Sequence, residues 1–230
     1  MTDRAQVAIV TGVSRGFGNA VARVLLEGGW SVIGDARNAA ALEEAAAGLP
    51  HPENLDVIAG DITDESHLQE LCEHASRRGR LQLVVNNAGG LGPSPLPRLL
   101  DVDVRVLHDL FWVNTVSQLR LLQLAVPSMH ERATVINVTS DASVEKYEGW
   151  GAYGATKAAL DLLTGVLAAE APAVRFYALD PGDMRTAMHQ AAFPGEDISD
   201  RATPEERAPA VLKLVNGELP SGRYRAEELL

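Results

Sequence analysis

A tyrosine and a lysine four residues apart could carry out proton transfer. Tyr153 and Lys157 share one face if their segment is helical, because helical residues four apart lie one above the other. A free tyrosine has a pKa of about 10 and is a reluctant acid or base near neutral pH. A neighbouring ammonium group favours the phenolate and should bring that pKa nearer the working range. In an arbitrary helix the same pair would more simply be a surface contact.

A glycine-rich turn near the N-terminus could bind phosphate. The apolar run 7–10 leads directly into Thr11-Gly-Val-Ser-Arg-Gly-Phe-Gly, and a helical pattern follows. Gly12, Gly16 and Gly18 permit a tight turn and a close backbone approach to a pyrophosphate, with helix N-terminal amides facing the charge. The motif requires this strand–turn–helix context, which favours nucleotide binding over a plain connection.

The same turn also spells Gly-X-Ser-X-Gly around Ser14, the pattern of a hydrolase nucleophile elbow. A triad could be completed by His189 with Asp180 or Asp183, but no oxyanion loop of the HGGG type is present. A serine hydrolase therefore remains a less favoured alternative.

Short apolar runs alternate with amphipathic stretches along most of the chain. The runs are rich in β-branched residues and cover residues 7–10, 31–34, 55–59, 81–85, 134–138 and 174–179. Such runs are typical of strands buried on both faces of a parallel sheet. Helical patterns cover residues 18–27, 39–47, 64–77, 101–130, 153–171 and 204–215, and residues 222–225 carry a weak strand pattern. The alternation predicts an α/β fold of the Rossmann type, a doubly wound parallel sheet with helices on both faces.

The length of 230 residues suits a single domain, 1–230. The irregular stretch 183–204 contains two prolines, a glycine and several acidic residues. Because a segment of that kind inside a compact domain is usually functional, we expect it to be a substrate-binding lid.

The composition excludes several classes of partner. The 31 acidic and 20 basic residues give a net charge of −11, which argues against binding to nucleic acid or an anionic membrane. The lone Cys72 excludes an internal disulfide and fits a reducing compartment. We see no zinc-type ligand spacing, no signal-peptide pattern and no apolar window of about 20 residues, and therefore predict a soluble cytoplasmic protein without a metal.

Seven motifs in order resemble the short-chain dehydrogenase/reductase family over roughly residues 7–186. Near the N-terminus, the glycine turn matches TGxxxGxG, Asp61 matches the acid that holds the adenine amino group, and residues 86–89 match NNAG. Further on, Asn114 matches the family's catalytic asparagine, residues 153–157 match YxxxK, and residues 181–186 resemble PGxxxT. Ser140, the remaining motif, precedes Tyr153 by 13 residues, as is common in the family.

The resemblance implies an oxidoreductase that reduces a ketone or aldehyde to an alcohol, or catalyses the reverse. Tyr153 would protonate the carbonyl oxygen, Ser140 would hold that oxygen, and Lys157 would also contact the nicotinamide ribose. Asn114 would hold a water that relays protons. A non-catalytic NADP-binding regulator of the same fold is the alternative, and the intact set of four residues argues against it.

The resemblance also implies a cofactor site. Its residues are Gly12, Ser14, Arg15, Gly16, Phe17, Gly18, Arg37, Asp61, Ile62, Asn87, Ala88, Gly89, Tyr153, Lys157, Pro181, Gly182, Met184 and Thr186. The family's NAD-selecting acid usually lies eighteen residues after the last turn glycine, where this chain has Ala36. Arg15 and Arg37 occupy positions that are often basic in NADP-dependent members, so we favour NADP(H) over NAD(H). Asp35 would weaken this clamp if it pointed inward.

The substrate site is expected to include Asp141, Tyr147, Trp150 and Met188, although packing within the domain would explain the last three equally well. Asp141 could meet a cationic or hydroxylated carbonyl or alcohol substrate. The tail 220–230 stops before the segment that builds the family's usual tetramer contact. A homodimer through the helical segments 101–130 and 153–171 is therefore favoured, with a tetramer as the other possibility.

Overall fold

The computed structural model describes residues 6–230 and contains a seven-stranded parallel sheet in the order β3-β2-β1-β4-β5-β6-β7. The strands are β1 (Gln6–Val10), β2 (Ser31–Ala36), β3 (Leu55–Ala59), β4 (Arg80–Asn86), β5 (Thr134–Val138), β6 (Arg175–Asp180) and β7 (Gly222–Arg225). All six apolar runs predicted as strands are strands. The weak pattern at the C-terminal end is also a strand, which pairs in parallel with β6.

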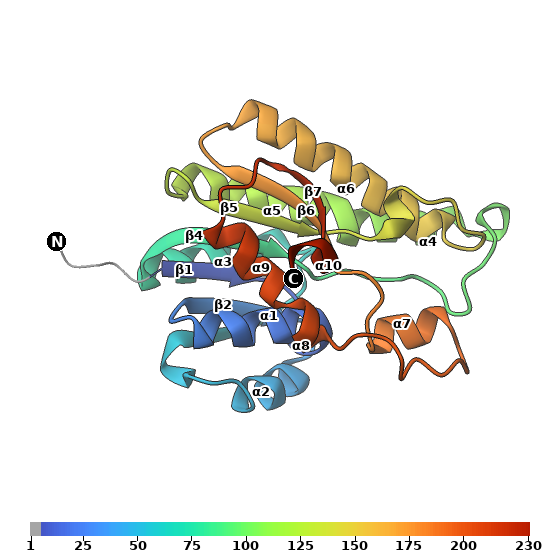
Figure 1. The fold of residues 1–230 in the computed structure, drawn as a ribbon, viewed down its shortest axis with the longest axis horizontal. Coiled ribbons are helices and arrows are strands. Elements are labelled where there is room, and N and C mark those ends of the chain that lie inside the picture. Colours follow the sequence, from blue (N-terminus) through green and yellow to red (C-terminus); the bar gives the residue numbers. More distant parts are fainter. Residues whose placement is uncertain (1–5) are drawn as a thin grey trace.

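Helices cover both faces of the sheet, which gives three layers (Figure 1). One face is covered chiefly by α1 (Gly16–Glu27), α8 (Pro204–Arg207), α9 (Pro209–Asn216) and α10 (Ala226–Leu229), with α2 (Ala39–Ala47) beside β2 and β3. The other is covered by α3 (Glu65–Arg78), α4 (Val104–Phe111), α5 (Ser117–Ala125) and α6 (Gly151–Glu170). The predicted doubly wound α/β fold is confirmed.

The two cores use alternate residues of each strand. In β1, Ala8 and Val10 pack on the side of α1 and α9, whereas Val7 and Ile9 pack on the side of α3 and α5. Strand side chains alternate between faces, so a strand covered on both sides must be apolar at nearly every position. This requirement explains why the strands are readable as continuous apolar runs.

The helical pattern predicted over residues 101–130 corresponds to continuous helical backbone over 104–125, but the bounds and the interior of this segment differ from the prediction. Leu99–Asp101 form a 3₁₀ turn, and α4 starts after Asp103, whose side chain accepts a hydrogen bond from the Arg105 amide at 2.9 Å. A π-helical turn, Trp112–Val116, separates α4 from α5, and a 3₁₀ turn over Val126–Ser128 ends the segment. The cap at Asp103 and the π-turn follow from local hydrogen bonds that hydrophobic periodicity does not report.

The irregular segment 183–204 contains a short helix, α7 (Ala187–Ala192), capped by the Thr186 hydroxyl, which accepts from the His189 amide at 3.2 Å. Figure 1 shows α7 at the right-hand end of the molecule, away from the two helical layers. No helix within residues 6–230 combines the length and the apolar character needed to cross a bilayer.

Two helical glycines provide a matched test of the first turn. A Cβ on Gly18 would overlap the Gly12 carbonyl and the Asn87 side chain, whereas a Cβ on Gly165 of α6 would meet open space. Gly18→Ala should therefore destabilise the fold by about 1–3 kcal/mol through overpacking. Gly165→Ala should be neutral or stabilising by up to about 1 kcal/mol, because alanine is the better helix former. Urea unfolding of both variants measures the difference, and equal effects would contradict a tight turn.

Candidate active site

A cavity of about 1200 Å³ lies at the carboxyl ends of the strands. It is bordered by the glycine turn, by the segments that follow β2, β3, β4, β5 and β6, and by α7. The strand order reverses between β1 and β4, and ligands of open α/β sheets bind at such a point. The volume exceeds the usual range for one drug-sized ligand, so a dinucleotide and a small substrate fit together.

The turn after β1 is held by the loop after β4. The Thr11 hydroxyl accepts hydrogen bonds from the amides of Asn87 at 3.0 Å and Ala88 at 2.9 Å. The Asn87 side chain donates back to the Thr11 carbonyl at 2.8 Å. Gly12 and Gly16 have φ of +77° and +60°, a region open to glycine at little cost. The predicted glycine and NNAG motifs thus form one unit.

The N-terminus of α1 is suited to a pyrophosphate. Arg15 is the N-cap residue, its backbone is extended, and its side chain makes no capping hydrogen bond. The first amides of a helix have no intrahelical partner and carry partial positive charge. The donors present therefore fit the phosphates of a dinucleotide.

Asp35 does not point into the cavity as a free acid. Its Oδ1 accepts a hydrogen bond from the Gly12 amide at 2.7 Å, and its Oδ2 lies 3.0 Å from His67 Nε2. Arg15 and Arg37 both border the cavity and are exposed. Neither forms a salt bridge with any residue in the range 6–230. Two guanidinium groups on the border of the cavity are therefore without a salt bridge in this range, Arg15 at the N-terminus of α1 and Arg37 directly after β2.

Helix α6 presents Tyr153 and Lys157 to the same cavity, next to Ser140 at the end of β5. Lys157 Nζ donates to the Val138 carbonyl at 2.8 Å and lies 5.7 Å from the centroid of the Tyr153 ring. The Ser140 hydroxyl donates to Asp141 Oδ1 at 3.0 Å. The three side chains that the sequence placed in one constellation are brought together.

The environment of Tyr153 differs from the expectation. Burial raises the pKa of Tyr153, the nearby carboxylates of Asp180 and Asp141 raise it further, and the neighbouring Ser140 hydroxyl opposes the rise. Burial lowers the pKa of Lys157 to about 8, against an opposing effect of Asp161. In the protein alone the pKa of Tyr153 is therefore raised and not lowered as expected, because burial and two acids act on the phenol. The phenol is neutral at neutral pH and can serve as a proton donor.

Asn114 lies in the π-helical turn and is fully buried. Its amide nitrogen donates to the Gly90 carbonyl at 2.9 Å and to Thr156 Oγ1 at 3.0 Å, and its Oδ1 accepts from the Gly90 amide at 2.8 Å. The side chain thus clamps the loop after β4 to α6. Asn114 does not itself line the cavity.

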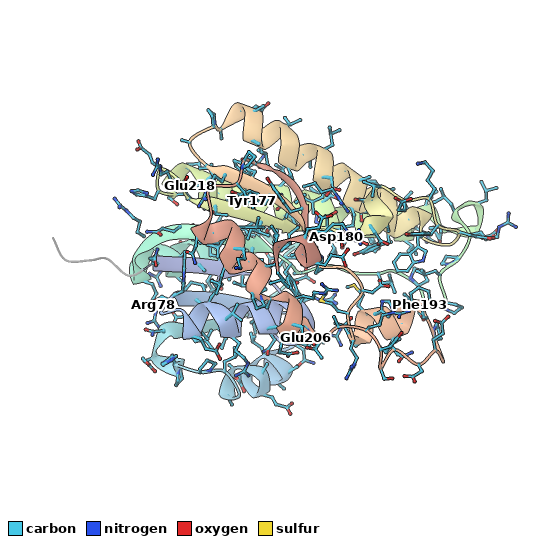
Figure 2. All side chains as sticks on the ribbon, viewed as in Figure 1. Arg78, Tyr177, Asp180, Phe193, Glu206 and Glu218 are labelled. Atoms are coloured by element: carbon cyan, nitrogen blue, oxygen red, sulfur yellow. The ribbon has the colours of Figure 1, made fainter. Side chains whose placement is uncertain are left out.

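The residues predicted to meet substrate all line the cavity. The Tyr147 hydroxyl donates to Asp141 Oδ2 at 3.1 Å, which fixes that carboxylate beside Ser140. The Trp150 ring lies 5.8 Å from the Tyr153 ring and 5.9 Å from the Phe193 ring. Figure 2 shows Phe193 beside α7 and Asp180 at the end of β6, both in the right-hand half of the view. An aromatic contact therefore joins the segment 183–204 to the catalytic helix.

Of the residues predicted to bind cofactor, all border the cavity except Gly18, which is buried under the turn. The hydrolase hypothesis finds no support in the geometry of Ser14. No hydrogen bond within residues 6–230 joins Ser14 to a histidine ring, and the nearest acid partner of His189 is Asp183, at 3.6 Å.

Sequence reasoning missed Arg223 on β7. Its guanidinium donates to the Ser140 carbonyl at 3.1 Å and to Asp180 Oδ2 at 2.9 Å, and its Nε lies 3.3 Å from Asp161 Oδ2. Cavity residues contributed by the loop after β4 and by α4 were missed as well, namely Leu91, Val106 and Leu110. In the sequence these three residues were distinguished only by their apolar side chains, which do not indicate a cavity. The role of Arg223 becomes visible once β7 is paired with β6.

Residues 6–197 match the family model of the short chain dehydrogenases. The chain belongs to this family. It is 35% identical over 201 residues to the sepiapterin reductase of Rattus norvegicus, covering 81% of this chain and 77% of that protein. It is 32% identical to an uncharacterized oxidoreductase of Saccharomyces cerevisiae, and the match covers 92% of this chain and 81% of that protein.

Solved structures of short chain dehydrogenases share the fold of this chain. A short chain dehydrogenase of Shigella flexneri in complex with NADP superposes with a TM-score of 0.89 at 26% identity, covering 99% of this chain and 100% of that one. A second short chain dehydrogenase, from Escherichia coli and in complex with NADPH, superposes with a TM-score of 0.87 at 27% identity. The match covers 99% of this chain and 99% of that one. This short-chain dehydrogenase is accordingly an NAD(P)-dependent oxidoreductase, so the non-catalytic and hydrolase alternatives are set aside.

Replacing Arg223 tests whether β7 supports the active site of this dehydrogenase. Arg223→Met leaves the buried Asp180 without its cation and should lower the free energy of unfolding by about 1–3 kcal/mol. It should also lower kcat by about tenfold with little change in KM, because Ser140 loses the donor that holds its carbonyl. Arg225→Met, on the same strand but paired with Glu227 at the surface, is the control. Equal kinetics in the two variants would contradict the role.

Proposed function

We propose that this dehydrogenase reduces a small ketone or aldehyde with NADPH, or oxidises the corresponding alcohol. One observation carries the proposal: the free Arg15 and Arg37, the glycine turn and the Tyr153–Lys157 pair border one continuous cavity. The names of the similar proteins support it, since these include a sepiapterin reductase and dehydrogenases in complex with NADP and NADPH.

The cofactor end of the cavity suits a 2′-phosphate. Arg37 and Arg15 would hold the phosphate, and the α1 N-terminus would hold the pyrophosphate. Asp61 keeps Oδ2 available for the adenine amino group, because the amide and hydroxyl of Thr63 both donate to its Oδ1. Residues 87–89 and 181–186 would hold the nicotinamide half.

The catalytic chemistry follows from the neutral phenol. Bound NADPH supplies the hydride. Tyr153 donates its proton to the substrate oxygen, and its raised pKa keeps that proton in place until the oxygen becomes basic. The Ser140 hydroxyl turns from Asp141 Oδ1 and donates its hydrogen bond to the same oxygen. The Lys157 ammonium, largely protonated below its pKa of about 8, stabilises the phenolate that remains. In the oxidative direction Tyr153 accepts the proton.

Asn114 would act from behind the cavity wall. Its Oδ1 accepts one bond from Gly90 and has a second lone pair with which it could hold the proposed relay water. Asp141, Tyr147, Trp150 and Met188 would contact substrate, and the segment 183–204 would close over it as a lid of the single domain.

The assembly and location belong to the same proposal. Trp112, Val116, Leu162 and Val166 are large apolar side chains that remain exposed on the π-turn and α6. Covering them would favour a homodimer through these helices. A cytoplasmic location rests on the single cysteine.

Arg37→Ala tests the cofactor preference. Removing one charge-assisted contact to the 2′-phosphate should raise the Kd for NADPH by about tenfold or more and leave the Kd for NADH within about twofold. Fluorescence titration measures both constants. Arg80→Ala, at the start of β4 and exposed, is the matched arginine control. A wild-type protein that binds NADH more tightly than NADPH would overturn the preference.

Tyr153→Phe tests the chemistry. The variant keeps the ring packed against Trp150 but has no proton to give, so carbonyl reduction should fall by about 100- to 10,000-fold. The Kd for NADPH should stay within about threefold of wild type. Turnover of a panel of ketones and aldehydes, followed by loss of NADPH absorbance, measures the effect. Substantial turnover in a well-folded variant would contradict Tyr153 as the acid.

A further inference from the structure

An acid and a histidine are paired behind the nucleotide turn, and the proposed function does not use them. Asp35 lies near the end of β2 and is 1% exposed, and His67 lies in the first turn of α3 and is 5% exposed. The His67 Nε2 atom lies 3.0 Å from Asp35 Oδ2, and the Gly12 amide donates to Asp35 Oδ1 at 2.7 Å. An ionised carboxylate only accepts hydrogen bonds, so Nε2 carries the proton. Both oxygens of Asp35 are therefore engaged.

The position of the His67 ring depends on a glycine. A Cβ on Gly60 would overlap the His67 ring. Gly60 directly follows β3, and its amide donates to the Ala36 carbonyl at 3.1 Å. The ring thus lies against the backbone between β3 and α3, and from there it reaches Asp35. The pair is built from three separate segments, β2, residue 60 and α3.

The direction of the Asp35 side chain follows from strand alternation. Ile33 of β2 packs into the core beneath α3, and Asp35, two residues later, lies on the same face. Ala36 packs into the opposite core, and Arg37 is the first exposed residue after it. The carboxylate and the guanidinium therefore border one cavity, but the carboxylate is held toward the glycine turn.

A free carboxylate at this point would oppose the binding of a 2′-phosphate. It would repel the phosphate and accept hydrogen bonds from an unphosphorylated ribose instead. A carboxylate that accepts one hydrogen bond on each oxygen, from a buried imidazole and from a backbone amide, is held in one orientation. His67 thereby changes the effect of an acid that lies two residues before Arg37.

We propose that His67 is a positioning residue for cofactor choice: it holds Asp35 on the Gly12 amide and so leaves Arg37 free to bind the 2′-phosphate. This inference rests on the proposed preference for NADP. His67 acts through Asp35 and does not touch the cofactor. The residue is not part of the nucleotide motifs and lies thirty positions beyond Arg37 in the sequence.

Four variants and two cofactors test the proposal by binding alone. The readout is the ratio of the Kd for NADH to the Kd for NADPH, from fluorescence titration without turnover, with a melting curve for each variant. His67→Leu frees the carboxylate and should lower the ratio by about tenfold. His67→Gln keeps a donor for Asp35 and should stay within about threefold of wild type. The double variant Asp35→Ser, His67→Leu lacks the carboxylate and should regain the wild-type ratio.

The fourth variant, Asp35→Asn, covers the case in which His67→Leu does not fold. Its side-chain carbonyl can still accept from the Gly12 amide, so removal of the charge should change NADPH affinity by less than about threefold. A gain of tenfold or more would show that the wild-type carboxylate already faces the phosphate, which overturns the proposal.

The remaining outcomes separate the two hypotheses. An unchanged ratio in a folded His67→Leu, or a double variant that does not recover, shows a merely structural role and overturns the proposal. A wild-type ratio below one overturns the preference for NADP. In that case a further fall of the ratio in His67→Leu still supports the positioning role.

Discussion

The close contact between the loops after β1 and β4 is the constraint on which the rest of the site depends. Thr11 accepts two hydrogen bonds from Asn87 and one from the Ala88 amide, and Gly18 must lack a side chain for the two loops to meet. Strand order reverses here, so the helices after β1 and β4 leave toward opposite faces and open a crevice between them. The glycine turn, the residues after β4 and, one strand further on, Ser140 therefore border one cavity. Loss of that contact would separate the cofactor end from the catalytic end.

The charged side chains that border the cavity are arranged differently from those of the acidic protein as a whole. The net charge of −11 would repel a dinucleotide if it were spread evenly over the cavity. Two buried acids that border the cavity are each held by a partner, Asp35 by a hydrogen bond with His67 and Asp180 by an ion pair with Arg223. Arg15 and Arg37 remain unpaired among the described residues. Two unpaired guanidinium groups thus border the cavity although the whole molecule is negative.

The catalytic end depends on elements with little sequence signal. The π-turn orients Asn114 toward Gly90 and joins α4, α5 and the loop after β4. The short β7 places Arg223 against the Ser140 carbonyl and Asp180, so this strand supports the segment directly after β5. Tyr153 packs with Leu91, Ala142 and Ala192, and this burial, together with two carboxylates, raises its pKa.

Most of the fold was determined by the sequence alone. Strands buried on both faces must be nearly continuous in apolar residues, so six strands could be located. The spacing of Tyr153 and Lys157 placed them on one helix face, and the family resemblance added Ser140 to them. The sequence could not show where Asp35 points, that a π-turn interrupts residues 101–130, or that Arg223 reaches Ser140. Those features are decided by the tertiary structure, because each is a hydrogen bond or ion pair between segments far apart in the chain. Periodicity reports which face of an element is buried, whereas the partner of a buried polar group is known only when the elements have packed.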